Sequence, residues 1–110
     1  MNIDKLLSYA LESGASDLHL STGSIPMVRI NGTMKPLNRP EMEDSDMETI
    51  LPQIMDEDQI SRYRKDKEID LSYKLDGQGR FRVNFFHQIS GLAGVFRTIS
   101  EVPKGFEELG

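Results

Sequence analysis

Residues 80–99 constrain the fold most, because apolar and polar side chains alternate along their first part. Phe81, Val83 and Phe85 take every second position, which is the period of a half-buried β-strand. A second run of β-forming residues ends the stretch, and residues 87–91 between the two runs are typical of a turn. The stretch therefore predicts a β-hairpin.

Two arginines face each other if the turn of this hairpin centres between Ile89 and Ser90. Opposite residue numbers then sum to 179, so that Arg82 lies across from Arg97. Like charges directly opposite each other on a sheet are unfavourable, and no Asp or Glu occurs between positions 77 and 100 to relieve them. The pattern therefore predicts a bound anion or an acidic group from elsewhere.

Charge is distributed unevenly along the chain. The 110 residues carry a net charge of −5, which argues against general nucleic-acid binding. Residues 41–76 hold 12 of the 18 acidic residues and 5 basic ones, a net charge of −7, whereas residues 77–100 hold three arginines and no acid, a net charge of +3. A local anion suits such a patch better than a polyanion. The absence of cysteine excludes disulfides and thiolate metal sites.

Periodicity and turn signals divide the chain, which has the length of one domain, into helices and strands. We expect a helix between Asn2 and Gly14, strands at 16–21, 27–30 and 33–37, a helix capped by Ser45 that Pro52 kinks or splits, a helix over 56–65 and a strand over 69–75. With the hairpin, the order is α-β-β-β-α-α-β-β-β. This order predicts an α+β domain, in which an antiparallel sheet has its helices packed on one side.

Neither histidine predicts a catalytic or metal site. We expect His19 to lie on a strand with Asp17 on the opposite face, so that the two do not pair. His87 lies beside the predicted turn, and two histidines this far apart are a poor metal signal. The sequence contains no phosphate-loop, dinucleotide-binding, nucleophile-elbow or metalloprotease motif. It therefore lacks a complete catalytic set of any common class.

The arginines are the remaining candidates. Arg82 and Arg97 are either surface charges or phosphate ligands, since a guanidinium offers a planar fork of donors that does not titrate. Such a fork can also stabilise charge on a transferring γ-phosphoryl group. Arg29 on the Asn31-Gly32 hairpin is a weaker candidate for a nucleotide or subunit contact.

Five motifs occur in order along the whole chain. They are residues 14–21 (GASDLHLS), 26–32 (PMVRING), 80–84 (RFRVN), 95–99 (VFRTI) and 107–110 (EELG). Together they resemble the N-terminal domain of the PilT and PilU family, the twitching motility ATPases of the secretion ATPase superfamily that retract type IV pili. Pro52 departs from the pattern expected of the second helix in this family.

The resemblance implies a PAS-like α+β domain over residues 1–100, with residues 101–110 starting a linker to a RecA-like ATPase domain. It implies ATP as the ligand, with Mg²⁺ held mainly by that second domain, and a homo-hexameric motor protein. The N-terminal domain of the family closes over ATP like a lid. Family arginines that reach the nucleotide phosphates match Arg82 and Arg97, as catalytic and nucleotide-binding residues, and Arg80 more weakly.

The same resemblance implies a cytoplasmic protein, peripheral to the inner membrane at the pilus base, that works with the pilus machinery and not with nucleic acid. The parent protein would be an ATPase, whereas the 110-residue piece lacks the Walker motifs and would be inactive. The alternative is a stand-alone PAS-like sensor or interaction domain, which would require a ligand cavity inside the sheet.

Overall fold

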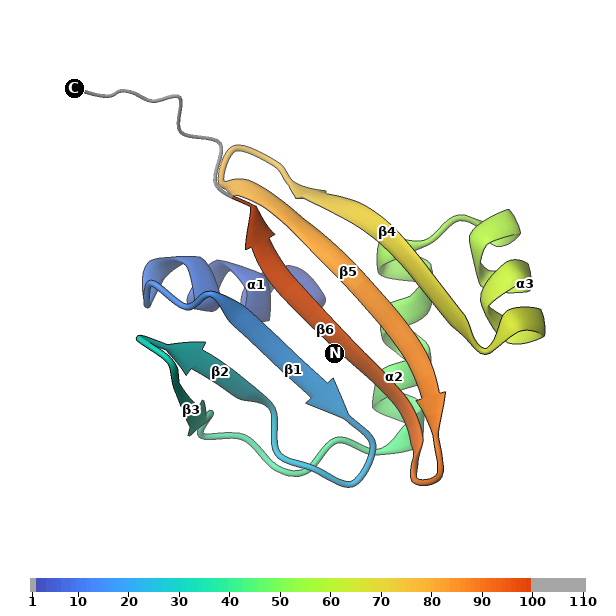
Figure 1. The fold of residues 1–110 in the computed structure, drawn as a ribbon, viewed down its shortest axis with the longest axis horizontal. Helices are drawn as coiled ribbons and strands as arrows, with labels where there is room; N and C mark the ends of the chain where they lie inside the picture. The colour runs from blue at the N-terminus through green and yellow to red at the C-terminus, as the bar shows by residue number, and fades with distance from the viewer. Residues whose placement is uncertain (1, 100–110) are drawn as a thin grey trace.

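The computed structural model describes residues 2–99 and has the α+β architecture that the sequence predicts (Figure 1). In chain order the elements are α1 (Ile3–Glu12), β1 (Asp17–Ser21), β2 (Met27–Ile30), β3 (Thr33–Pro36), α2 (Asp44–Ile54), α3 (Glu57–Asp66), β4 (Glu68–Leu75), β5 (Gly79–Gln88) and β6 (Gly91–Ile99). This order is the predicted one. The expected linker at 101–110 lies outside the described residues, and none of the described helices is long and apolar enough to cross a membrane.

The six strands form one sheet in the order β3-β2-β1-β6-β5-β4, and every neighbouring pair is antiparallel. The last strand, β6, lies between β1 and β5, so it joins the two halves of the sheet (Figure 1). Asp17 at the start of β1 therefore lies opposite Arg97 of β6, although 80 positions separate them in the sequence.

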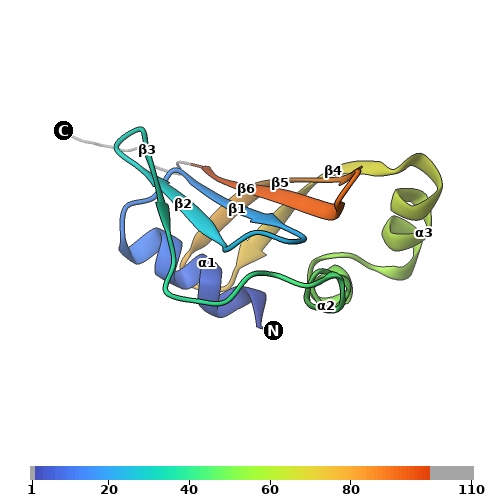
Figure 2. The ribbon, with the colours of Figure 1, turned by 90° about the horizontal axis from the view of Figure 1, so that it is seen from below.

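Helices α1 and α2 lie on one side of the sheet and leave the other face open (Figure 2). Phe81, Val83 and Phe85 of β5 are fully buried in the core that the sheet shares with the helices, whereas Arg82 is exposed and Asn84 is half-buried. The alternation predicted for this strand is confirmed. Phe81, Val83 and Phe85 thus join the core, and Arg82 and Asn84 lie on the open face.

Phe85 lies at a point where α3, β5 and β6 meet. Its ring contacts the rings of Tyr63 from α3 and Phe96 from β6 edge-on, with centroids 5.9 and 6.2 Å away. It also covers Gly94, its cross-strand partner on β6, so closely that a Cβ there would lie 2.6 Å from the ring. The aromatic ring is thus the reason that this position of β6 carries glycine.

Side chains cap the first turns of α1 and α3. The Asn2 side chain accepts a hydrogen bond from the amide of Lys5 in the first turn of α1. At the start of α3, Asp56 and Gln59 exchange two side chain to backbone hydrogen bonds of 2.8 and 2.9 Å. Gly14 follows α1 with a φ of 74°, which glycine adopts without strain and which ends the helix.

The turn of the arginine hairpin is shorter than predicted. Only Ile89 and Ser90 lie outside the two strands, and His87 lies within β5. A two-residue loop allows the hydrogen-bond ladder to continue to the end of both strands. Opposite residue numbers still sum to 179, as predicted, because the loop centres between the same two residues.

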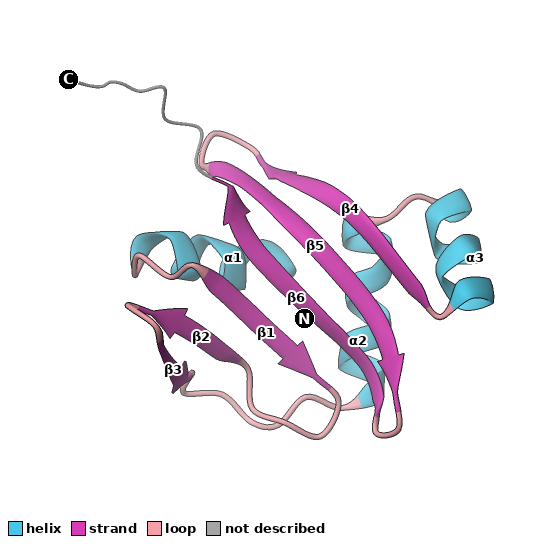
Figure 3. Cartoon of the chain, viewed as in Figure 1, coloured by secondary structure: helices cyan, strands magenta, loops and turns pink. Residues whose placement is uncertain are grey.

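The prediction for the start of α2 is wrong, and the helix runs through Pro52. The N-cap is Glu43 rather than Ser45, because the Asp46 carboxylate accepts a hydrogen bond from the Glu43 amide. Pro52 does not split the helix, which Figure 3 shows as continuous. Proline removes one hydrogen bond from a helix interior, and here that bond falls close to the end at Ile54, where little helix remains to be interrupted.

We expect Gly94→Ala to lower the free energy of unfolding by about 1–3 kcal/mol, because the added methyl group would overlap the ring of Phe85. Gly79→Ala is the matched control, since a Cβ there would lie 3.3 Å from the flexible side chain of Leu11. Urea unfolding of both variants measures the two effects. Equal losses in the two variants would contradict this packing of Phe85 on Gly94.

Candidate functional site

Three arginines and one aspartate form a single row across the open face. Register places Asp17 of β1 opposite Arg29 of β2 on one side and opposite Arg97 of β6 on the other. Arg97 lies in turn opposite Arg82 of β5, as the sequence predicts. Because directly paired residues of a sheet share a face, the row is Arg29, Asp17, Arg97 and Arg82 across four adjacent strands.

Asp17 is the acidic group that relieves the repulsion in this row. Its carboxylate lies 3.3 Å from Nε of Arg97 and 3.5 Å from Nε of Arg29. His19, two residues further along β1, lies 3.4 Å from the same carboxylate through Nε2. Although Asp17 is on the open face, it is only 4% exposed. The side chains of Arg29, Arg97 and His19 all contact this buried carboxylate.

The prediction that Asp17 and His19 point to opposite faces is wrong. Residues two apart on a strand share a face, and the two side chains are in contact. The spacing of Asp17 and His19 in the sequence was therefore a usable signal for this pair. The contacts of Asp17 with Arg29 and Arg97 had no such local signal, since they depend on which strands lie beside β1.

The pKa of Asp17 lies below its ordinary value of 3.8. Burial raises this pKa, but hydrogen bonds from Arg97 and His19 and the attraction of their charges outweigh burial and lower it. The carboxylate is therefore ionised at neutral pH. It provides a fixed negative charge against which the arginines are held.

Arg82 has a longer and more exposed acidic contact. Its Nε lies 3.8 Å from Asp70 of β4, and both side chains are more than half exposed. Arg82 and Asp70 line a hollow of about 440 Å³ on the open face together with Asn84, Val95 and Arg97. The hollow thus presents two guanidinium groups, one amide and one exposed carboxylate. Guanidinium forks of this kind bind phosphate and carboxylate groups.

The other two candidate arginines lie outside this hollow. Arg29 faces Asp17, and it also donates a hydrogen bond of 3.2 Å from Nη1 to the Gly32 carbonyl within its own hairpin. Arg80 lies two residues before Arg82 on β5 and lines a separate hollow at the turn between β4 and β5. The structure therefore places Arg82 and Arg97 in one hollow and Arg80 in another.

His87 has a structural contact rather than a place in the arginine row. Its Nδ1 lies 3.3 Å from the hydroxyl of the buried Tyr63, which connects the end of β5 with α3. Within residues 2–99, no three His, Cys, Asp or Glu side chains are grouped so that they could hold a metal ion.

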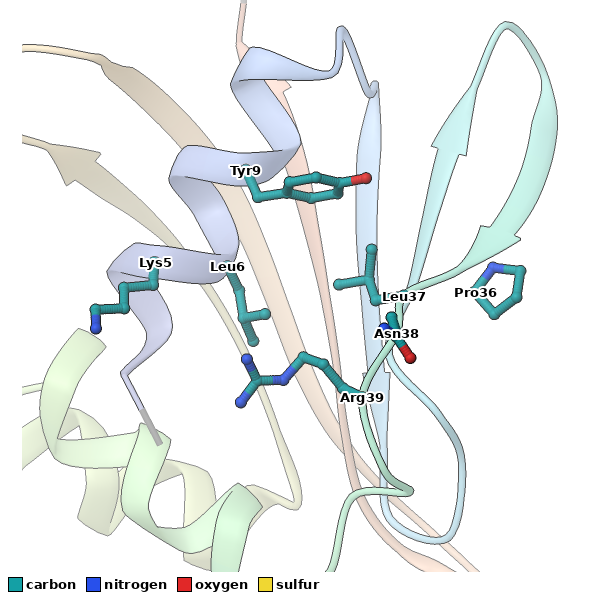
Figure 4. A pocket seen from close by; sticks show the side chains of 7 residues that line it. All are labelled: Lys5, Leu6, Tyr9, Pro36, Leu37, Asn38 and Arg39. Carbon is teal, nitrogen blue, oxygen red and sulfur yellow. The ribbon is translucent and has the colours of Figure 1, made fainter.

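A second hollow of about 440 Å³ lies between α1 and the segment that follows β3 (Figure 4). Its lining consists of Lys5, Leu6, Tyr9, Pro36, Leu37, Asn38 and Arg39. Figure 4 shows Leu6 and Tyr9 of α1 across from Leu37, which makes much of the lining apolar. This hollow includes no carboxylate or histidine, and it shares no residue with the arginine hollow.

Comparison with known proteins identifies relatives for the chain, although no protein-family model matches it. The chain is 40% identical over all 110 residues to the type IV pilus retractation ATPase PilT of Pseudomonas aeruginosa, and it covers 32% of PilT. It is 33% identical, over 99% of its length, to the type IV pilus ATPase PilU of the same organism, and it covers 28% of PilU. The chain is homologous to PilT and PilU.

The fold of the chain agrees with this homology. A crystal structure of the pilus retraction motor PilT with bound ADP matches 93% of the chain with a TM-score of 0.84 and 32% sequence identity, and the match covers 30% of that structure. The chain thus spans about a third of its PilT relatives and corresponds to their N-terminal domain. The α+β fold class and the resemblance seen in the sequence are confirmed.

We expect Asp17→Asn to lower the free energy of unfolding by about 1–2 kcal/mol at neutral pH, because an amide interacts more weakly with two arginines than a carboxylate does. A carboxylate whose pKa is lowered by folding stabilises the fold above its unfolded pKa. That contribution is lost as the pH falls through the folded pKa. The difference between wild type and variant should therefore be constant near neutral pH and shrink as the pH falls below 3.8.

Urea unfolding of both proteins across a pH series measures this difference. Asp70→Asn is the matched control, because Asp70 is 57% exposed and its contact with Arg82 is 3.8 Å long. We expect that variant to change stability little. A pH-independent effect of Asp17→Asn, or an equal effect of Asp70→Asn, would contradict the role of Asp17 as a buried, charged partner.

Proposed function

We propose that this chain is the N-terminal domain of a type IV pilus retraction ATPase in which Arg82 and Arg97 contact the phosphates of bound ATP. The observation that carries this proposal is the cross-strand arginine pair, which lines one hollow on the open face of a PilT-like domain. Two cations placed opposite each other on a sheet favour an anion between them. Phosphate is an anion that guanidinium forks bind in a bidentate manner.

In this proposal Arg82 and Arg97 act as arginine fingers. Both side chains are about 70% exposed, so a phosphate group held by another domain can approach them. As the γ-phosphoryl group transfers, negative charge spreads over its oxygens, and guanidinium groups already in place stabilise that charge. Arg29 and Arg80 lie outside the hollow, and we assign them no direct contact with the transferring group.

The other parts of the ATPase belong to a second domain. We propose that residues 1–100 form the N-terminal domain, that residues 101–110 begin a linker, and that a RecA-like domain beyond it holds the phosphate loop and Mg²⁺. The sequence contains no phosphate loop, so the 110-residue chain alone is inactive. Closure of the N-terminal domain over ATP, like a lid, then couples hydrolysis to movement.

The assembly that we propose is a homo-hexameric ring on the cytoplasmic side of the inner membrane, at the base of the pilus. The support for this assembly is the homology to PilT, whose solved structure is described as that of a pilus retraction motor. In such a ring, the exposed face of one domain is available to a nucleotide held between subunits.

In the full-length ATPase, we expect Arg82→Ala or Arg97→Ala to lower kcat by about 10²–10³-fold, because the charge that they stabilise develops mainly in the transition state. The affinity for ATP should fall less, since the second domain holds most of the nucleotide. The fall in kcat of the double variant should be smaller than the product of the falls in the two single variants, because both arginines act on one group. Steady-state ATPase kinetics measure all three variants.

Lysine variants test the geometry of the same contact. Arg82→Lys and Arg97→Lys should restore little activity, because an ammonium group cannot form the bidentate fork. Arg62→Ala is the matched control, since Arg62 is an exposed arginine on α3 and not part of the open-face row. Near-wild-type kcat in both alanine variants would leave Arg82 and Arg97 as surface residues, and the proposed function would lose its site.

A further inference from the structure

We propose that Asp17 is a positioning residue, which holds the guanidinium of Arg97 in the orientation that receives a phosphate group. The proposal rests on the proposed function of Arg82 and Arg97 and extends it to a residue that touches no phosphate itself. Among residues 2–99, Asp17 is the only charged residue that is buried. A buried charge is costly in free energy unless it is paired. The partners of Asp17 therefore indicate what it does.

The atoms that take part in the contact indicate this role. Asp17 Oδ1 lies 3.3 Å from Nε of Arg97, the guanidinium nitrogen nearest the side-chain stem. The hydrogen bond from Arg97 to Asp17 is donated by Nε, and the Arg97 side chain remains 69% exposed. A carboxylate that holds Nε restricts the orientation of the guanidinium plane while it leaves the terminal donors for a ligand.

Asp17 is itself held from a second direction. Its other oxygen, Oδ2, lies 3.5 Å from Nε of Arg29 and 3.4 Å from Nε2 of His19. Arg29 is held in turn by its hydrogen bond to the Gly32 carbonyl. β1 also pairs with a strand on each side, which gives the carboxylate a rigid base. Arg29 and His19 thus support the carboxylate that orients Arg97.

Asp70 lies on the other side of the arginine pair and differs from Asp17. It is 57% exposed, and its carboxylate lies 3.8 Å from Nε of Arg82. It also lines the same hollow as Arg82 and Arg97, which Asp17 does not. Asp70 is therefore placed to compete with an anion for the hollow. The two aspartates carry the same charge but should affect anion binding in opposite directions.

Titration of the 110-residue chain with inorganic triphosphate, followed by NMR at constant ionic strength, separates these roles. We expect Asp17→Asn to weaken triphosphate binding about two- to tenfold, because the ligand must then order the Arg97 side chain itself. Asp70→Asn should strengthen binding, since it removes a repelling carboxylate. If only net charge mattered, both variants would bind triphosphate more tightly than the wild type does.

The Nε–H resonance of Arg97 gives a second measurement that needs no ligand. We expect this proton to be protected from solvent exchange in the wild type and in Asp70→Asn, and to lose its protection in Asp17→Asn. Asp17→Glu is a further variant, which keeps the charge but moves the carboxylate by one methylene group. It should also weaken triphosphate binding, whereas a role of charge alone predicts no change. Far-UV circular dichroism identifies which variants are folded.

The possible failures are distinguishable. Triphosphate binding by folded Asp17→Asn and Asp17→Glu that is as tight as in the wild type would overturn the positioning role and leave the phosphate site intact. An equally protected Arg97 Nε–H in Asp17→Asn would do the same. If the wild type shows no response at Arg82 and Arg97 to triphosphate, both the phosphate site and the positioning role are overturned.

Discussion

The placement of β6 between β1 and β5 is the constraint on which both the core and the candidate site depend. Successive residues of a strand point to opposite faces. The register that buries Phe96 against the helices therefore places its neighbour Arg97 on the open face, between Asp17 and Arg82. A slip of one residue would expose the apolar side chains and move the arginines to the wrong face. Selection for a stable core thus also maintains the geometry of the charged row.

The sequence predicts the β5–β6 hairpin well because the information is local. Alternation identifies the two strands, and the turn fixes Arg82 opposite Arg97. The pairing of β6 with β1 could not be predicted from these patterns, since it brings together residues 80 positions apart in the sequence. The acidic partner of Arg97 was missed for this reason. The start of α2 is ambiguous in the sequence, because Glu43, Asp44, Ser45 and Asp46 can each cap a helix.

The charged row and Asp70 together carry a net positive charge. Three arginines in the row are opposed by Asp17, which is buried and in contact with two of them, and by Asp70, which is exposed and at 3.8 Å from the third. Three arginines and two aspartates leave a net charge of +1 on these five groups. A net positive charge at these five groups favours an anion. This charge supports the proposal that another domain presents a nucleotide to the Arg82 and Arg97 pair.

A crystal structure of the full-length ATPase with Mg²⁺ and a non-hydrolysable ATP analogue tests the phosphate site most directly. We predict that oxygens of the terminal phosphate lie within hydrogen-bond distance of the guanidinium groups of both Arg82 and Arg97, at about 2.7–3.2 Å. Asp17 should still contact Nε of Arg97 in that structure. A closed, nucleotide-bound ring in which every phosphate oxygen lies beyond about 6 Å, the limit for close charge interactions, from both guanidinium groups would contradict the assignment.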